Sequence, residues 1–158
     1  MTRAIRIAAT AITLLLIVAM WVTLVLAYPG LPARVPTHFG IDGRADGYGP
    51  RSSLFLTPLV ATVVCCFLFA ATRIARGRPN LPFAIPPAAM PLALAGLRAF
   101  MATQALMVAA LFFVIQRGTF AAATGGSAGL GPGLLLAVGA YEVGAIAIFF
   151  GALYRLRG

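Results

Sequence analysis

Four long apolar runs dominate this chain of 158 residues and limit what it can fold into. The runs cover residues 7–27, 54–72, 92–115 and 133–154. A helix of about 20 apolar residues crosses the hydrocarbon core of a bilayer, so each run is long enough to span it. The first run is too long for the apolar core of a signal peptide, and we expect it to be kept. The sequence therefore predicts an all-α integral membrane protein with four transmembrane helices in a single membrane domain.

The composition agrees with lipid as the main solvent of the chain. Charged residues make up 9% of the sequence, against about 25% in soluble domains, and the mean hydropathy is +0.99. The net charge of +9 comes from twelve basic residues, all of them arginines, which stand singly at the ends of the apolar runs. No basic stripe with interleaved aromatic residues is present, so nucleic acid is not an expected partner.

The arginines also predict the direction of the helices, because basic residues are enriched in cytoplasmic segments. If both termini are cytoplasmic, eight arginines lie on that side: Arg3, Arg6, Arg73, Arg76, Arg78, Arg98, Arg155 and Arg157. Four then lie outside: Arg34, Arg44, Arg51 and Arg117. We therefore expect a multi-pass protein with cytoplasmic termini. Residues 28–53 would form a small extracytoplasmic cap, and residues 73–91 a cytoplasmic linker rich in proline and arginine.

Three polar residues interrupt the last two apolar runs. Glu142 lies near the middle of the fourth run, Gln104 near the middle of the third, and Arg98 about two turns closer to the cytoplasm. An ionisable group at that depth costs about 3 kcal/mol, so it usually faces the interior of the bundle. One interpretation makes Glu142 a proton or cation site. The other, which we favour because a relay needs a second acid or a histidine, makes it a structural residue that joins two helices.

A stripe of small residues follows one face of the fourth run. Its members are spaced by four, three and four positions, and they are Ala140, Gly144, Ala147 and Gly151. Such a stripe lets a second helix approach closely in lipid. The neighbour is either another helix of this chain or a second copy, so homo-oligomerisation is one expectation.

The loop between the first two runs holds most of the chain's ionisable chemistry. It contains the single histidine, His38, and two of the three acidic residues, Asp42 and Asp46. Asp-Gly pairs at 42–43 and 46–47 favour turns and hairpins. We expect a compact cap of turns or short strands, with Phe39, Ile41 and Tyr48 packing onto the helix ends.

Three chemical interpretations of this loop remain open. His38, Asp42 and Asp46 are competent metal ligands, but their spacing matches no zinc or calcium pattern. His38 as a general base lacks a serine or cysteine nucleophile in a known motif. The favoured interpretation has the two aspartates capping turns through the backbone while His38 fixes the loop as a recognition surface. We therefore expect neither an enzyme nor a bound cofactor.

The segment "LPARVPTHFGIDGRADGYGPR", residues 31–51, resembles a signature of SdpI-like bacterial membrane proteins. The resemblance covers about residues 15–65. The matching positions are Leu31, Pro32, Val35, Pro36, His38, Phe39, Gly43, Asp46, Gly47, Tyr48, Gly49 and Arg51. Gly40 stands where the family usually has Asn or Asp. The resemblance implies a protein of the bacterial cytoplasmic membrane with a role in immunity to a secreted peptide toxin and in signalling.

These observations predict a non-enzymatic sensor or immunity protein that recognises a peptide or envelope ligand through its outer loop. The residues expected to recognise the ligand or to fix the loop are His38, Phe39, Asp42, Asp46, Tyr48 and Arg51. The expected partners are the lipid bilayer and either a peptide ligand or a membrane or cytoplasmic protein. The alternative is a small transporter or a subunit of a transport complex that uses Arg98, Gln104 and Glu142.

Overall fold

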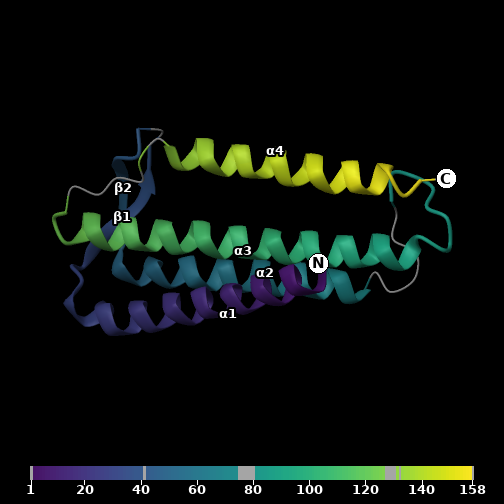
Figure 1. Ribbon diagram of the computed structural model, residues 1–158. Coiled ribbons are helices and arrows are strands. Elements are labelled where there is room, and N and C mark those ends of the chain that lie inside the picture. The colour runs from purple at the N-terminus through teal and green to yellow at the C-terminus, as the bar shows by residue number, and fades with distance from the viewer. Residues whose placement is uncertain (1, 41, 75–80, 127–130, 132, 158) are drawn as a thin grey trace.

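The structure is a computed structural model that describes residues 2–40, 42–74, 81–126, 131 and 133–157. It contains four long helices and one β-hairpin (Figure 1). The helices are α1 (Thr2–Ala27), α2 (Leu56–Ile74), α3 (Met90–Ala123) and α4 (Gly133–Tyr154), and the strands are β1 (Arg34–Phe39) and β2 (Ala45–Pro50). Short 3-10 helices, η1 (Tyr28–Gly30) and η2 (Arg51–Phe55), flank the hairpin.

Among the described residues, four helices are long and apolar enough to cross a membrane, which confirms the predicted fold class. Their outer surfaces expose large apolar side chains, as expected for helices that lipid surrounds. Leu26, Phe67, Leu136 and Ile148 are among the most exposed. Part of the linker expected at 73–91, residues 75–80, lies outside the described residues.

Helix α3 is the centre of the bundle. Helices α1 and α2 pack against it on one side, and α4 runs along the other (Figure 1). The face of α3 that packs in the bundle is built mainly from alanines. Its fully or almost fully buried members are Ala93, Ala99, Ala102, Ala105 and Ala109. Small side chains let neighbouring backbones approach closely in lipid, where packing replaces the hydrophobic effect as the main attraction between helices.

Hydroxyl and thiol groups inside the bundle donate to backbone carbonyls, whereas the Oε1 atoms of Gln104 and Gln116 are buried without a hydrogen-bond partner among the described residues. The hydroxyls of Thr13 and Thr23 donate to backbone carbonyls in the preceding turn of α1, which makes threonine tolerable in an apolar helix. The Sγ of Cys65 donates to the carbonyl oxygen of Ala105 at 3.3 Å and so links α2 to α3. Cys65 is buried and Cys66 is exposed, and both thiols are free.

The hairpin lies at one end of the bundle, where α1 and α3 end and α2 begins (Figure 1). Strands β1 and β2 are antiparallel, and irregularities in their register flank His38. Gly43 adopts a φ of 77° in the turn between the strands, a conformation that favours glycine. One apolar core joins the hairpin to α1, η2 and α3. Its buried members are Leu24, Leu31, Val35, Leu54 and Phe120.

The contacts that attach the hairpin differ from those expected. Tyr48 is 56% exposed and does not pack onto the helix ends. Val35, the second residue of β1, is completely buried and attaches the hairpin to the bundle instead. Phe39 is half-buried, and Ile41 lies outside the described residues. Tyr48 pairs with Pro36 across the hairpin and Val35 pairs with Gly49, so Tyr48 and Val35 lie on opposite faces of the hairpin.

Candidate functional site

The tip of the hairpin brings its histidine and one of its aspartates together. His38 lies on β1 opposite Gly47 on β2, and its Nδ1 is 2.5 Å from the Oδ1 of Asp46. A Cβ atom at position 47 would lie 2.9 Å from the Cβ of His38. Glycine at 47 therefore allows the two strands to approach at the histidine. Both side chains stay in solvent, with 72% of His38 and 53% of Asp46 exposed.

The other aspartate of the hairpin, Asp42, shapes the turn between the strands. The Oδ1 of Asp42 accepts a hydrogen bond from the backbone N–H of Arg44 at 3.0 Å, which is the Asx-turn geometry. A Cβ atom at Gly40 would lie 2.9 Å from that oxygen and 3.2 Å from the Oδ2 of Asp46. Carboxylates from both aspartates thus converge beside Gly40. This crowding gives a physical reason for glycine at a position where the resembling family usually carries Asn or Asp.

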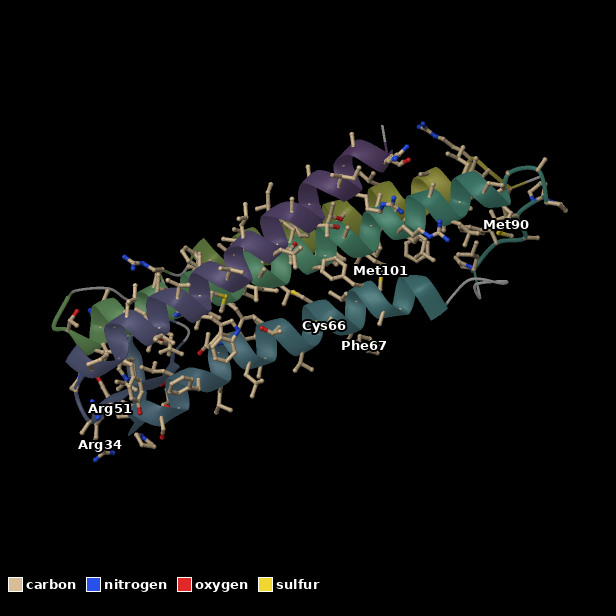
Figure 2. All side chains as sticks on the ribbon, turned by 90° about the horizontal axis from the view of Figure 1, so that it is seen from below. Arg34, Arg51, Cys66, Phe67, Met90 and Met101 are labelled. Carbon is tan, nitrogen blue, oxygen red and sulfur yellow. The ribbon has the colours of Figure 1, made fainter. Side chains whose placement is uncertain are left out.

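Arg51 fastens the hairpin to the end of α1. Its guanidinium carbon lies 4.8 Å from the centroid of the Tyr28 ring, close enough for a cation–π contact. Its Nη1 donates to the carbonyl oxygen of Leu31 at 3.4 Å, and its backbone N–H donates to Ala33 at 3.0 Å. Figure 2 shows Arg34 and Arg51 at the hairpin end of the bundle. Of the residues expected to recognise a ligand or fix the loop, Arg51 occupies a position that fixes the loop.

The polar side chains of the hairpin are exposed to solvent. Within the part of the chain that the structure describes, no three His, Cys, Asp or Glu side chains are placed to hold one metal ion. The His38–Asp46 pair is open to water, whereas catalytic electrostatics is strongest in sites that exclude water. The His38 imidazole, the carboxylates of Asp42 and Asp46 and the Tyr48 ring are all exposed on the hairpin and together form a polar surface.

Two of the polar residues expected inside the membrane, Gln104 and Glu142, join α3 to α4. The Nε2 of Gln104 donates to the Oε2 of Glu142 at 2.5 Å. The hydroxyl of Tyr141 donates to the carbonyl oxygen of Thr103 at 3.0 Å. Arg98 is half-buried, and the ion pairs of the described residues all lie in the hairpin, so it makes none with Glu142. This arrangement is that of a polar contact between two helices.

A double-mutant cycle measures this contact. Because interhelical hydrogen bonds in membrane proteins contribute about 0.6 to 1.7 kcal/mol, we expect Gln104→Leu and Glu142→Leu to show a coupling of about 1 kcal/mol. Unfolding by increasing amounts of a denaturing detergent gives the free energies. Gln116→Leu is the matched control, since Gln116 contacts α1 and should not couple to Glu142→Leu. A coupling of zero between positions 104 and 142 would contradict the contact.

Sequence reasoning missed Gln116, which is the most buried polar side chain at the hairpin end, with 1% exposed. Its Nε2 donates to the carbonyl oxygen of Met20 at 2.8 Å and to the Oγ1 of Thr23 at 3.3 Å, and so joins α3 to α1. The third apolar run was expected to end at residue 115, one position before Gln116. The structure continues α3 to Ala123, so Arg117, expected in an outer loop, also lies on the helix.

The small-residue stripe on α4 is open within the chain. Ideal Cβ atoms built at Gly144 and Gly151 meet no neighbouring atom within 4 Å in the described part of the chain. The alanines that bring helices together lie on α3 instead, as described above. Oligomerisation through Ala140, Gly144, Ala147 and Gly151 therefore stays a prediction.

The segment that carries the hairpin is similar to segments of known proteins. Residues 15–62 match a family described as a domain of unknown function, DUF1648. An uncharacterized protein of Archaeoglobus fulgidus is 33% identical over 63 residues, which are 40% of this chain and 34% of that protein. The chain thus matches about a third of the length of this curated relative. No solved structure matches the chain. The second half of α1, the hairpin and the start of α2 are accordingly similar to the DUF1648 domain.

Proposed function

We propose that this protein is a non-enzymatic, multi-pass protein of the bacterial cytoplasmic membrane with an SdpI-like sensor or immunity role. Its hairpin recognises a peptide or envelope ligand on the extracytoplasmic side. The orientation rests on the distribution of the arginines, eight of which lie in the segments assigned to the cytoplasm. The similarity to DUF1648 at residues 15–62 supports a common role for the segment that contains the hairpin.

The observation that carries this proposal is the exposed His38–Asp46 pair. Its two side chains are held in one geometry by their mutual contact at 2.5 Å and by the strands on which they stand. The hairpin is itself fixed to the bundle through Val35 and Arg51. A surface that is ordered before binding loses less conformational entropy when a ligand binds. The exposed Tyr48 ring adds an aromatic contact of the kind that often dominates interface energies.

We expect substitutions in the pair to leave the fold intact. An exposed ion pair contributes little to stability, so His38→Ala and Asp46→Ala should each shift the unfolding midpoint by less than about 3 °C. Thermal unfolding in detergent, followed by circular dichroism, checks this. A larger loss would mean that the pair holds the hairpin together, and the recognition role would lose its main support.

Affinity purification from native membranes tests the proposal. The tagged wild type, His38→Ala, Asp46→Ala and Glu142→Gln are purified in parallel, and the peptides and proteins that co-purify are quantified by mass spectrometry. We expect the hairpin variants to lose a partner that the wild type and Glu142→Gln retain. The opposite pattern, with loss in Glu142→Gln alone, would overturn recognition by the hairpin and support transport through the intramembrane residues.

A further inference from the structure

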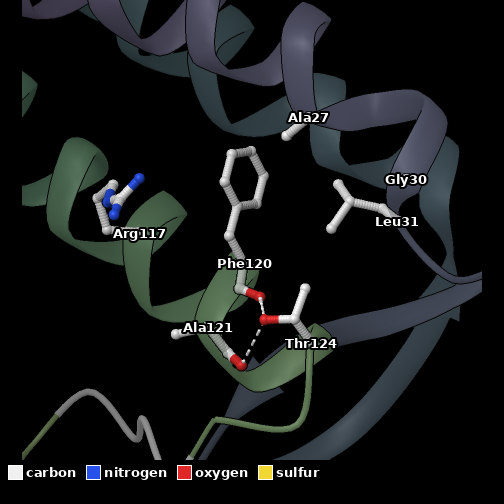
Figure 3. A pocket seen from close by; sticks show the side chains of 7 residues that line it. All are labelled: Ala27, Gly30, Leu31, Arg117, Phe120, Ala121 and Thr124. Atoms are coloured by element: carbon white, nitrogen blue, oxygen red, sulfur yellow. Dashed lines mark hydrogen bonds between the residues drawn. The ribbon is translucent and has the colours of Figure 1, made fainter.

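An open pocket of about 490 Å³ lies beside the hairpin, between the end of α1 and the end of α3. Figure 3 shows the Phe120 ring between Arg117 on one side and Ala27 and Leu31 on the other. The lining residues are Ala27, Gly30, Leu31, Arg117, Phe120, Ala121 and Thr124. None of them belongs to the polar surface of the hairpin. The pocket is thus a separate feature, lined by both polar and apolar atoms and by one cationic side chain.

Arg117 is the free cationic group of this pocket. Its side chain is exposed, and it makes no hydrogen bond or ion pair with the residues that the structure describes. The hydroxyl of Thr124 lies against the carbonyl oxygens of Phe120 and Ala121, at 3.0 and 3.2 Å. The Thr124 hydroxyl therefore donates its proton to the backbone and not to a ligand. The guanidinium remains the main donor available to a ligand.

The position of Arg117 on α3 favours a pocket at the edge of the bilayer. Arg117 lies two residues beyond the expected end of the third apolar run, at residue 115. Because such a run spans the hydrocarbon core, which is about 30 Å thick, Arg117 falls near the boundary of that core. Its guanidinium group then lies at the level of the lipid headgroups, and the apolar atoms of the pocket are within reach of lipid chains.

We propose that this pocket binds an anionic phospholipid, with its phosphate on Arg117 and part of an acyl chain along Ala27 and the accessible edge of Phe120. Arginine presents a planar set of donors that matches the oxygens of a phosphate. A pocket of about 490 Å³ falls within the usual range for small-molecule sites. It holds a headgroup and a short length of chain, while the remainder of the lipid stays in the bilayer.

Two substitutions separate the contributions of charge and shape. Arg117→Gln removes the cation and keeps a polar side chain of similar length. Gly30→Leu adds apolar volume at the pocket wall, where an added Cβ meets nothing within 4 Å in the described part of the chain. Arg44→Gln is the matched control, because Arg44 is an exposed arginine at the hairpin turn, away from the pocket.

Native mass spectrometry of the full-length protein in neutral detergent tests the proposal, with phosphatidylglycerol and phosphatidylcholine of identical chains as probes. We expect the wild type and Arg44→Gln to retain one phosphatidylglycerol. Arg117→Gln should raise the half-saturating lipid concentration about tenfold, as loss of a charge-assisted hydrogen bond predicts. Gly30→Leu should also weaken retention, and thermal unfolding of each variant shows whether it is folded.

Three results would overturn the assignment. Equal retention of phosphatidylcholine would show that the site does not select an anionic headgroup. Equal behaviour of Arg117→Gln and Arg44→Gln, or unchanged binding by folded Gly30→Leu, would place the bound lipid elsewhere. Displacement of the lipid by excess inorganic phosphate would show that the site binds the anion without its hydrocarbon chain.

Discussion

Replacing Val35 by aspartate should detach the hairpin from the bundle and lower the free energy of unfolding by about 3 kcal/mol or more. Val35 is completely buried, in a core that contains Leu24 of α1, Leu54 of η2 and Phe120 of α3. A carboxylate in that position would be buried without a partner, which is among the most costly changes a core can suffer. Unfolding by a denaturing detergent, followed by the fluorescence of the single tryptophan, Trp21, measures the loss.

Thr37→Asp is the control for this prediction. It places the same charge on the same strand, at an exposed position, and should change the unfolding free energy little. Detachment of the hairpin should also make its backbone amides exchange with solvent faster in Val35→Asp than in Thr37→Asp. If the two variants are equally stable, Val35 is not the residue that anchors the hairpin.

Replacing Ala105 by leucine should force α2 and α3 apart and destabilise the bundle by about 1 to 3 kcal/mol. Ala105 is completely buried, and its carbonyl oxygen lies 3.3 Å from the Sγ of Cys65 on α2. The added carbons have no space between backbones that approach so closely. In lipid the loss is not offset by a hydrophobic gain, because leucine is as well solvated by acyl chains as by the core.

Ala70→Leu is the matched control, since Ala70 is exposed on the outer face of α2. The same detergent unfolding series should show it within about 0.5 kcal/mol of the wild type. Equal destabilisation by the two leucines would contradict the close packing of α3. Greater destabilisation by Ala70→Leu would place the helix contact on the face of α2 that we assign to lipid.

The sequence was sufficient to predict the helices, because the length of an apolar run is a local property and the thickness of the bilayer sets the threshold. Four runs were expected, and four helices able to span a membrane are found in the described part of the chain. The end of α3 was misjudged because Gln116 and Arg117 interrupt the apolar run. The Nε2 of Gln116 donates to α1 and the Arg117 side chain is exposed, and the helix continues past both residues to Ala123.

Packing was harder to predict, because it depends on how each helix is rotated about its axis. The small residues of α4 formed the most regular stripe, yet this stripe is open within the chain. The alanines of α3 are the ones buried between helices. The pairing of Gln104 with Glu142 followed from their similar depth in neighbouring runs. Gln116 was missed because it lies just past the expected end of its apolar run, and its contacts are with the carbonyl oxygen of Met20 and the Oγ1 of Thr23 on α1.

The hairpin illustrates the same limit at the candidate site. Of the two Asp-Gly pairs that predicted turns, the first lies in the turn, where Gly43 adopts a positive φ, whereas Asp46 and Gly47 lie within β2. The contact between His38 and Asp46 depends on the register of β1 and β2, which shifts beside the histidine. A register shift of this kind changes which side chains face each other across the hairpin, and no short motif encodes it.

The central claim is that the hairpin is a recognition surface on the extracytoplasmic side, and site-specific photo-crosslinking tests it most directly. A photoreactive phenylalanine analogue replaces Tyr48, and intact cells are irradiated under native growth conditions. A second protein carries the analogue in place of Phe67, which is exposed on α2. We predict that position 48 crosslinks an extracytoplasmic peptide or envelope component, that His38→Ala abolishes this crosslink, and that position 67 gives only lipid adducts. The claim would be contradicted if position 48 captured a cytoplasmic protein, or if its products were unchanged by His38→Ala.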